Sequence, residues 1–262
     1  MVFIFLPPSE GKTEPRDSQA PGVDLEKLVL PEISPAREEV AAALEQVSSH
    51  EEAQRILKVG NSVMDHVRAN AALRQKPAAP AHEVYTGVLY DALRAAELDA
   101  HALQAAEREV LIFSGLFGVA GFTDRIPPYR LAMGVDLQVP GSGRGPGKLG
   151  RYWREVLTGP LSERVAEHLV VDCRSSAYTQ AFRPPARQAL AVNNFRSSGG
   201  KRTVVTHFAK QARGELAGML ARRTGPAETV DEVAHIASSR WNVEVRPATG
   251  QTPHQLDLID HA

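Results

Sequence analysis

The stretch that decides the fold runs from Ile112 to Gly134, IFSGLFGVAGFTDRIPPYRLAMG. It opens on an apolar run, passes through Gly115 and Gly118, and then meets two consecutive prolines. Glycine permits positive φ and a close approach of the backbone, whereas proline holds an extended path. Three side chains of the second half offer hydrogen-bond donors: Arg125, Tyr129 and Arg130. The pattern fits two structures equally well, a turn between strands and a shaped loop that holds phosphate or carboxylate.

The composition of the whole chain is that of a globular protein. Of its 262 residues, 43% are hydrophobic and 23% are charged, and no linker divides them, so we expect one domain over residues 1–262. The single cysteine, Cys173, lies in an apolar run; it excludes an internal disulfide framework and is expected to be a buried, inert thiol. No run approaches the roughly 18 apolar residues of a membrane span. These features predict a cytoplasmic protein without a membrane partner.

Charge is distributed unevenly along the chain. The net charge is −1, which argues weakly against bulk binding of nucleic acid. Residues 1–109 hold 11 Lys/Arg and 18 Asp/Glu, whereas residues 110–262 hold 19 and 13. The second half is therefore basic and could face an anion, unless both halves merge into one neutral globule.

Hydrophobic periodicity predicts a mixed order of strands and helices. We expect strands at Met1–Leu6, Val110–Phe113, His168–Cys173, Leu190–Phe195, Thr203–Phe208 and Asn242–Arg246, with one or two more within Leu131–Val139. We expect helices at Pro35–Val47, 51–59, 61–74, Gly87–Ala96, Leu149–Leu157, Leu161–Ala166, Ser175–Phe182, Ala209–Arg223 and Thr229–Ser238. A Ser-Ser-Gly-Gly turn before Thr203 predicts a hairpin. The irregular order favours an α+β (mixed α/β) fold with a central sheet and surrounding helices, not a simple doubly wound sheet.

A Gly-Lys-Thr step follows the first strand directly. Ser9, Lys12 and Thr13 stand where a phosphate-binding loop would place its ligands. The nucleotide-hydrolysing motif needs a glycine at position 6, where this chain has Leu6. The segment therefore predicts a looser cradle for phosphate or carboxylate, with Lys12 as the positive charge.

Further anion-binding candidates lie in the second half. Gly141–Gly147 is a glycine-rich loop before Lys148, which opens a helix; it predicts either an anion site or a mobile surface loop. Lys210 and Arg213 share one face near the start of a helix, where cations oppose the helix dipole, so we expect them to hold an anion.

Polar residues also follow the strand that ends near Cys173. Asp172, Ser175 and Tyr178 lie at this strand end, where side chains converge on clefts. Asp172 is a candidate acid or base, or merely a partner of Arg174, and Ser175 is a candidate helix cap. The nine histidines are scattered without metal-ligand spacing, and no dinucleotide fingerprint occurs, so neither a metal nor a cofactor is expected.

Several blocks together resemble the YaaA family of peroxide-stress proteins. The family's Ser-Gly-Leu-aromatic-Gly-Val step and its Pro-Tyr-Arg-Leu-x-Met-Gly run both stand in the opening stretch. Other matching blocks are FLPPSEGKT at Phe5–Thr13, VYTG at Val84–Gly87, Gly147-Lys148 with Tyr152-Trp153, VVDCRSSAY at Val170–Tyr178 and FAKQARG at Phe208–Gly214. The resemblance implies one compact body with a cleft. It also implies DNA binding through a helix-hairpin-helix element, whose nearest counterpart is Gly115–Gly118.

Two hypotheses follow for the function. The first is a protein that binds DNA through a basic cleft and protects against oxidative stress. The second is an enzyme that acts on a nucleobase, nucleotide or other anionic small molecule in the same cleft. Its catalytic candidates are Lys12, with a lowered pKa, Asp172 and Tyr178. In both, the expected lining is Lys12, Arg125, Tyr129, Arg130, Lys148, Lys210 and Arg213. The oligomeric state is left open.

Overall fold

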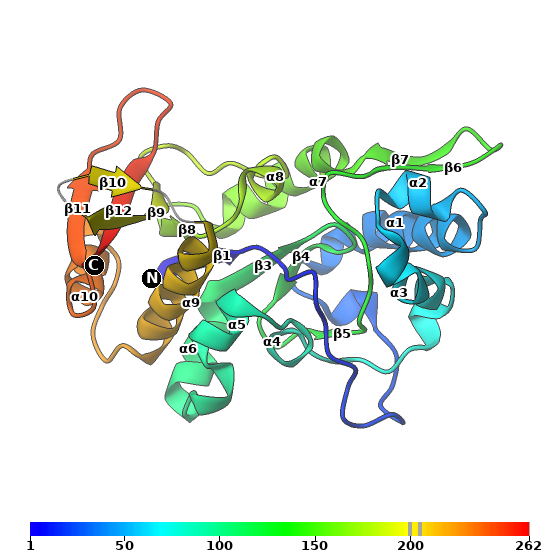
Figure 1. The fold of residues 1–262 in the computed structure, drawn as a ribbon, viewed down its shortest axis with the longest axis horizontal. Helices are drawn as coiled ribbons and strands as arrows, with labels where there is room; N and C mark the ends of the chain where they lie inside the picture. Colours follow the sequence, from blue (N-terminus) through cyan, green and yellow to red (C-terminus); the bar gives the residue numbers. More distant parts are fainter. Residues whose placement is uncertain (199–200, 204–205, 262) are drawn as a thin grey trace.

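An eight-stranded sheet runs through the centre of the molecule (Figure 1). The computed structural model describes residues 1–198, 201–203 and 206–261. The strands of the sheet are β1 (Val2–Leu6), β3 (Val110–Ser114), β4 (Gly118–Gly121), β8 (Leu169–Asp172), β9 (Ala189–Ser198), β10 (Lys201–Thr203), β11 (Asn242–Arg246) and β12 (His254–His261). Their order is β11-β12-β9-β8-β1-β3-β4, and β10 pairs with the end of β9.

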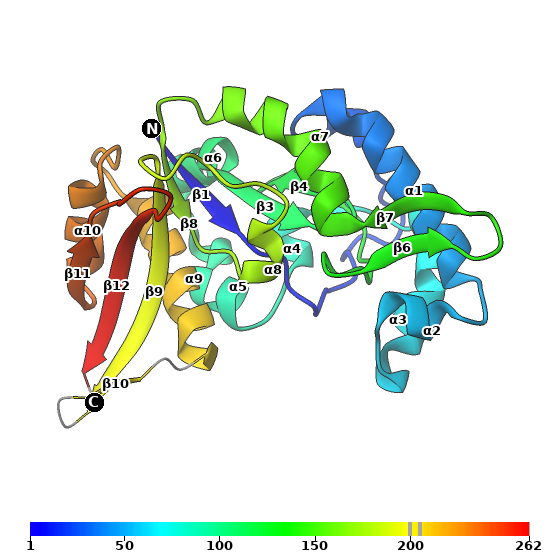
Figure 2. The same ribbon diagram turned by 90° about the horizontal axis from the view of Figure 1, so that it is seen from above.

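The five inner strands of this sheet are parallel. β1 pairs in parallel with both β3 and β8, β8 with β9, and β9 with β12. Only the edge strands β4 and β11 and the short β10 are antiparallel to their neighbours. All five residues of β1 are buried, as expected for a strand covered on both faces. Figure 2 shows β1 beside β8 and β9 in the middle of the molecule.

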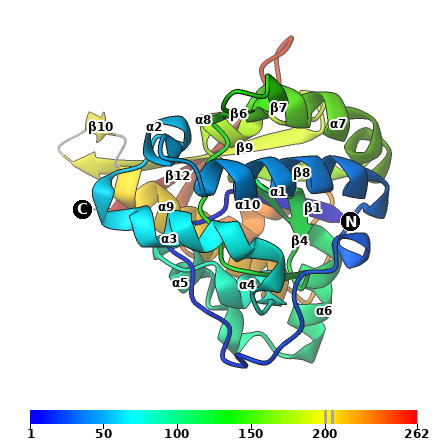
Figure 3. The same ribbon diagram turned by 90° about the vertical axis from the view of Figure 1, so that its right-hand side faces the viewer.

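Helices cover the sheet on both faces. They are α1 (Ser34–Ser48), α2 (Ala53–Leu57), α3 (Met64–Ala69), α4 (Ala81–Val84), α5 (Val88–Leu93), α6 (Ala100–Glu109), α7 (Leu149–Arg164), α8 (Ser176–Thr179), α9 (Thr206–Arg222) and α10 (Val230–Ser238). In Figure 3, α1 and α7 lie above strands β1 and β4, and α5 and α6 lie below them. Two small antiparallel pairs stand apart from the sheet: β2 (Ala79–Pro80) with β5 (Arg125–Ile126), and β6 (Asp136–Val139) with β7 (Arg144–Lys148).

The predicted mixed α/β class is confirmed, with one difference in topology. The parallel pairing of the inner strands was not predicted from the order of elements, because the connections between parallel neighbours have very different lengths. β1 reaches β3 through residues 7–109, whereas β8 reaches β9 through residues 173–188. The first connection leads from β1 to β3 on one side, and the second leads from β8 to β9 on the opposite side. The carboxyl ends of β1 and β8 thus form a switch point, where α/β proteins bind ligands.

Several local predictions were wrong in part. The strand expected at Thr203–Phe208 ends at Thr203, and α9 begins at Thr206; the expected hairpin with β9 is present, although residues 199–200 lie outside the described residues. The expectation of one or two strands within Leu131–Val139 is confirmed by β6 at Asp136–Val139. Residues 144–147, expected as loop, and Lys148, expected to open a helix, form β7 because this segment pairs with β6.

The remaining difference concerns α7. We expected two helices separated by Gly159-Pro160, but one helix continues through Pro160. Trp153, Leu157 and Leu161 recur every four residues and are fully buried. This continuous apolar stripe stabilises the helix across the proline.

Candidate functional site

A cavity of about 590 Å³ lies at the switch point. Its wall includes the segment after β1 (Pro7–Lys12), residues after β8 (Cys173, Ser175, Tyr178), the segment Arg130–Gly134 and two residues of α9. Parallel strands end at one edge of the sheet, so segments distant in sequence meet here. The cavity therefore has the position that ligand sites occupy in this class of fold.

The charge of the lining is strongly positive. The cationic members are Lys12, Lys58, Arg130, Lys210 and Arg213, and the only carboxylate among the lining residues is Glu10. Glu10 forms a salt bridge with Arg130, in which the Arg130 Nη2 lies 3.0 Å from the Glu10 Oε2. Because positive groups outnumber negative ones in a recessed site, the cavity is suited to an anion.

A network of backbone and hydroxyl contacts positions Lys12. The Ser9 hydroxyl donates to the Gly11 carbonyl and accepts from the Thr86 N–H at 3.0 Å. The Thr13 N–H donates to the Val84 carbonyl at 2.9 Å. These bonds join the turn after β1 to the segment before α5. The Lys12 Nζ then donates to the Ser9 carbonyl at 2.8 Å.

The Lys12 amine rests on two aromatic rings. Its Nζ lies 4.3 Å from the centre of the Tyr129 ring and 5.3 Å from that of Tyr85. Burial, together with the nearby Arg130, lowers the pKa of Lys12 from 10.5 to about 7, against the opposing effect of Glu10. Both protonation states are populated near neutral pH, as acid–base catalysis requires.

A directed chain of hydroxyls holds these rings in place. The Ser114 Oγ accepts from the N–H groups of Leu116 and Phe117 at 3.1 and 3.0 Å. With those lone pairs occupied, its own proton points to the Tyr129 hydroxyl at 2.7 Å, and Tyr129 donates to Tyr85 at 2.9 Å. Burial raises the pKa of both tyrosines well above 10, so the chain stays protonated. The hydroxyl chain thus fixes the Tyr129 ring, on whose face the Lys12 amine lies.

Seven of the residues predicted from sequence line this one cavity. They are Ser9, Lys12, Arg130, Ser175, Tyr178, Lys210 and Arg213. Burial raises the pKa of Tyr178 to about 12, so its hydroxyl remains a donor. Arg213 donates to the Val192 carbonyl at 3.0 Å, whereas Lys210 is exposed.

Asp172 is placed outside the lining. Both of its carboxylate oxygens accept from Arg174, at 2.8 and 2.7 Å. The Arg174 side chain is fully buried, and its guanidinium lies 4.0 Å from the centre of the Phe113 ring. Of the two roles considered for Asp172, the structure places it as the partner of Arg174.

Six further candidates also lie outside the cavity lining: Thr13, Gly115, Gly118, Arg125, Tyr129 and Lys148. Tyr129 is buried behind Lys12 and contacts the site through that amine. Arg125 donates to the Ala78 carbonyl, and Lys148 is an exposed residue at the end of β7. Their sequence contexts resemble ligand loops, but their hydrogen bonds build the short hairpins instead.

The two glycines of the opening stretch are structural. Gly118 has a φ of +70°, and a Cβ on it would come within 2.5 Å of the Trp153 ring. Residues 115–118 are buried and connect the strands β3 and β4. The expectation of a helix-hairpin-helix element at this point is therefore wrong, because its flanks are strands and phosphates cannot reach it.

Sequence reasoning missed several lining residues. They include Glu10, which follows Ser9, and Thr86, which belongs to the VYTG block whose resemblance was noted without a role. Lys58 ends α2 in the left-handed conformation, with φ +54°, and donates to the Gly134 carbonyl. No local motif indicates that Lys58 reaches the cavity.

Cys173 lines the cavity, but its thiol is expected to be unreactive. Burial raises the pKa of its thiol to about 12, so the reactive thiolate is scarce at neutral pH. The prediction of a buried thiol is confirmed.

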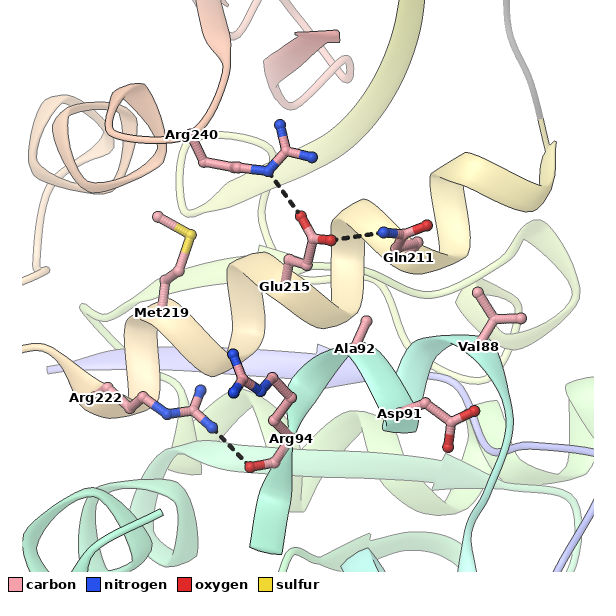
Figure 4. Close-up of a pocket in the computed structure, with 9 residues that line it drawn as sticks. All are labelled: Val88, Asp91, Ala92, Arg94, Gln211, Glu215, Met219, Arg222 and Arg240. Atoms are coloured by element: carbon pink, nitrogen blue, oxygen red, sulfur yellow. Dashed lines mark hydrogen bonds and ion pairs between the residues drawn. The ribbon is translucent and has the colours of Figure 1, made fainter. Parts of the chain in front are cut away.

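A second hollow, of about 630 Å³, lies between α5 and α9 (Figure 4). Its arginines are already engaged. Arg240 pairs with Glu215 at 3.2 Å, and Arg222 donates to the carbonyls of Leu93 and Arg94. The hollow also has two carboxylates, Asp91 and Glu215, beside its three arginines, so its charge is closer to balance than that of the cavity at the switch point.

Residues 1–198, 201–203 and 206–261 include neither a metal-ligand cluster nor a membrane-spanning helix. No group of three or more His, Cys, Asp or Glu side chains in that part of the chain is placed to hold a metal ion. Over the same residues, no helix combines the length and apolarity needed to cross a membrane.

The fold and cavity define the class: an α/β protein with a basic pocket at the switch point of a parallel sheet. A family model described as peroxide stress protein YaaA matches residues 1–245. A UPF0246 protein of Streptomyces coelicolor is 38% identical over 267 residues, which cover 99% of each chain. One of Corynebacterium efficiens is 36% identical, covering 96% of this chain and 98% of its own. The chain therefore belongs to the peroxide stress protein YaaA family, which confirms the resemblance seen in the sequence.

Proposed function

We propose that the cavity binds an anionic small molecule of nucleotide size and that Lys12 transfers a proton in its conversion, as part of protection against peroxide. The observation that carries the proposal is the enclosed Lys12 amine, which no carboxylate of the described chain pairs with at salt-bridge distance. A cavity of about 590 Å³ falls within the usual range for small-molecule sites, about 300–1,000 Å³.

The roles of the other residues follow from their charges. Arg130 and Lys210 supply positive charge for a phosphate or carboxylate, with Arg130 able to donate in a bidentate manner. Tyr178 offers a hydroxyl that stays protonated. The site thus combines an anion clamp with one tunable amine.

The first test is binding of AMP measured by titration calorimetry. We expect Arg130→Met to weaken binding by about tenfold to a hundredfold, because it removes charge-assisted hydrogen bonds. Lys148→Met is the matched control, since it removes a cation outside the cavity, and it should bind normally. If AMP, adenine and inorganic phosphate all fail to bind the unmodified protein, the proposal is rejected.

A second candidate function is binding of DNA phosphates at the cavity mouth. It is favoured by the exposure of Lys58 and Lys210, which lie on separate segments of the lining. Such contacts would be independent of base sequence.

Duplex binding should then depend on salt through these two lysines. We expect the double variant Lys58→Ala, Lys210→Ala to reduce the slope of log affinity against log salt by about 1.8, because each phosphate contact contributes about 0.9. Fluorescence anisotropy with a labelled duplex measures the slope, and Lys27→Ala is the control at an exposed lysine paired with Asp24. An unchanged slope in the double variant removes the mouth of the cavity from any DNA interface.

A further inference from the structure

We propose that Lys12 is a covalent nucleophile, whose amine condenses with the carbonyl carbon of an aldehyde or ketone that carries a phosphate or carboxylate group. The proposal deepens the proposed function and rests on it, because it names the substrate class of the same cavity. It is argued from the contacts of the Lys12 nitrogen, the surplus of cations around it and the chemistry of its aromatic floor.

The contacts of the nitrogen leave it available for attack. The Lys12 Nζ donates a hydrogen bond to the Ser9 carbonyl and lies against the faces of Tyr129 and Tyr85. Neither contact consumes the lone pair of a neutral amine, since a carbonyl and a ring face both take up the hydrogen side. An enclosed amine beside other cations is the arrangement that activates a lysine for attack on carbonyls.

The surrounding cations make Lys12 redundant as a counter-charge. Arg130, Lys210 and Arg213 line the same cavity and can hold the anionic group of the substrate. Arg130 is oriented by Glu10, and Arg213 by the Val192 carbonyl. The Lys12 amine, which lies against the rings of Tyr129 and Tyr85, is therefore free for a different task.

The condensation balances without an outside reagent. The Nζ lone pair forms a bond to the carbonyl carbon while the carbonyl π electrons move to oxygen, and a proton passes from nitrogen to that oxygen to give a carbinolamine. The C–O bond then breaks, and the oxygen leaves as water after taking a second proton. The sum is amine plus carbonyl to imine plus water, with no change of oxidation state. Tyr178, which lines the cavity, is a donor for the departing oxygen.

The aromatic floor suits the product as well as the reactant. A protonated imine keeps the positive charge of the lysine at nearly the same place. The faces of Tyr129 and Tyr85 attract such a cation. The hydroxyl chain from Ser114 fixes these faces, so the site stabilises the imine without rearrangement.

The test uses the full-length protein and pyridoxal 5′-phosphate as an aldehyde probe that carries a phosphate. After borohydride reduction, peptide mass spectrometry should find the adduct on Lys12, formed about a hundredfold faster than on the exposed Lys27, because far more of an enclosed amine is neutral. Lys12→Arg should lose this adduct. Lys148→Met, outside the cavity, should keep it.

A matched alcohol separates this proposal from the function on which it rests. Pyridoxine 5′-phosphate has the same phosphate and ring but no carbonyl, so it can bind without forming an imine. Modification that spreads over exposed lysines and spares Lys12 overturns the covalent role, even if the alcohol binds. If the alcohol also fails to bind or to protect Lys12, the anion site itself is rejected.

Discussion

Replacing Arg37 with leucine is expected to lower the free energy of unfolding by about 3–5 kcal/mol, the largest effect of any substitution considered. Arg37 is fully buried in α1. Its guanidinium donates to five carbonyls: those of Leu25, Val29 and Leu30 before α1, and those of Phe117 and Val119 at the start of β4. Leucine can donate to none of them. The carbonyls of Leu25, Leu30 and Phe117 keep a second donor, whereas those of Val29 and Val119 lose the guanidinium, and a buried carbonyl left unpaired is costly.

Urea denaturation of both proteins measures the loss. Arg68→Leu is the control, because its salt bridge with Asp65 is exposed and should contribute about 0–1 kcal/mol. If Arg37→Leu does not fold, Arg37→Lys keeps the charge with fewer donors and should show an intermediate loss. A loss below about 1 kcal/mol in either variant would mean that solvent satisfies these carbonyls.

The second large effect has the opposite sign. Lys12→Met is expected to stabilise the protein at pH 7 by about 2–4 kcal/mol, because it removes an amine whose charged form is disfavoured by burial. The pKa of Lys12 falls from 10.5 in an exposed chain to about 7 in the fold. Between these values the unfolded chain binds more protons, so stability is full above pH 10.5 and is lost as the pH falls toward 7.

Unfolding measured from pH 7 to 10 tests this directly. The unmodified protein should gain stability across the range from this group, and Lys12→Met should show a flatter profile. Lys27→Met, at a side chain that is 81% exposed, should leave the profile unchanged. A destabilised Lys12→Met would show that the protein fully compensates the buried ammonium, which would argue against a neutral amine in the site.

The sequence indicated where individual strands and helices lie better than it indicated which strands pair with one another. β1 was predicted because Val2–Leu6 is a short apolar run, and such runs are buried strands in most folds. The parallel pairing of β1 with β8 was not predicted, because pairing between segments so far apart leaves no periodic signal. Pro160 was misread because local propensity favours a break, whereas the burial of Trp153 and Leu161 decides the outcome.

The residues of the candidate site were likewise predicted only in part. Lys12 and Arg130 could be expected from the residue types at turns, and the structure brings them to one cavity. Lys58 and Glu10 could not be predicted, because only the folded arrangement of their segments brings them to the cavity. Conversely, Arg125 and Lys148 stand in glycine- and proline-rich contexts that suggest a ligand, yet such contexts also build hairpins. Local sequence cannot distinguish these two uses of the same residues.

The central position of β1 has a consequence for synthesis on the ribosome. Ile4 pairs with Val110 and Val2 with Leu169, so the strand emerges long before either partner. At about 5–20 residues per second, the wait for Leu169 lasts roughly 8–30 s. During that interval an apolar strand with two unpaired edges is open to aggregation or to capture by a chaperone, and the switch-point cavity cannot exist until translation has passed β8.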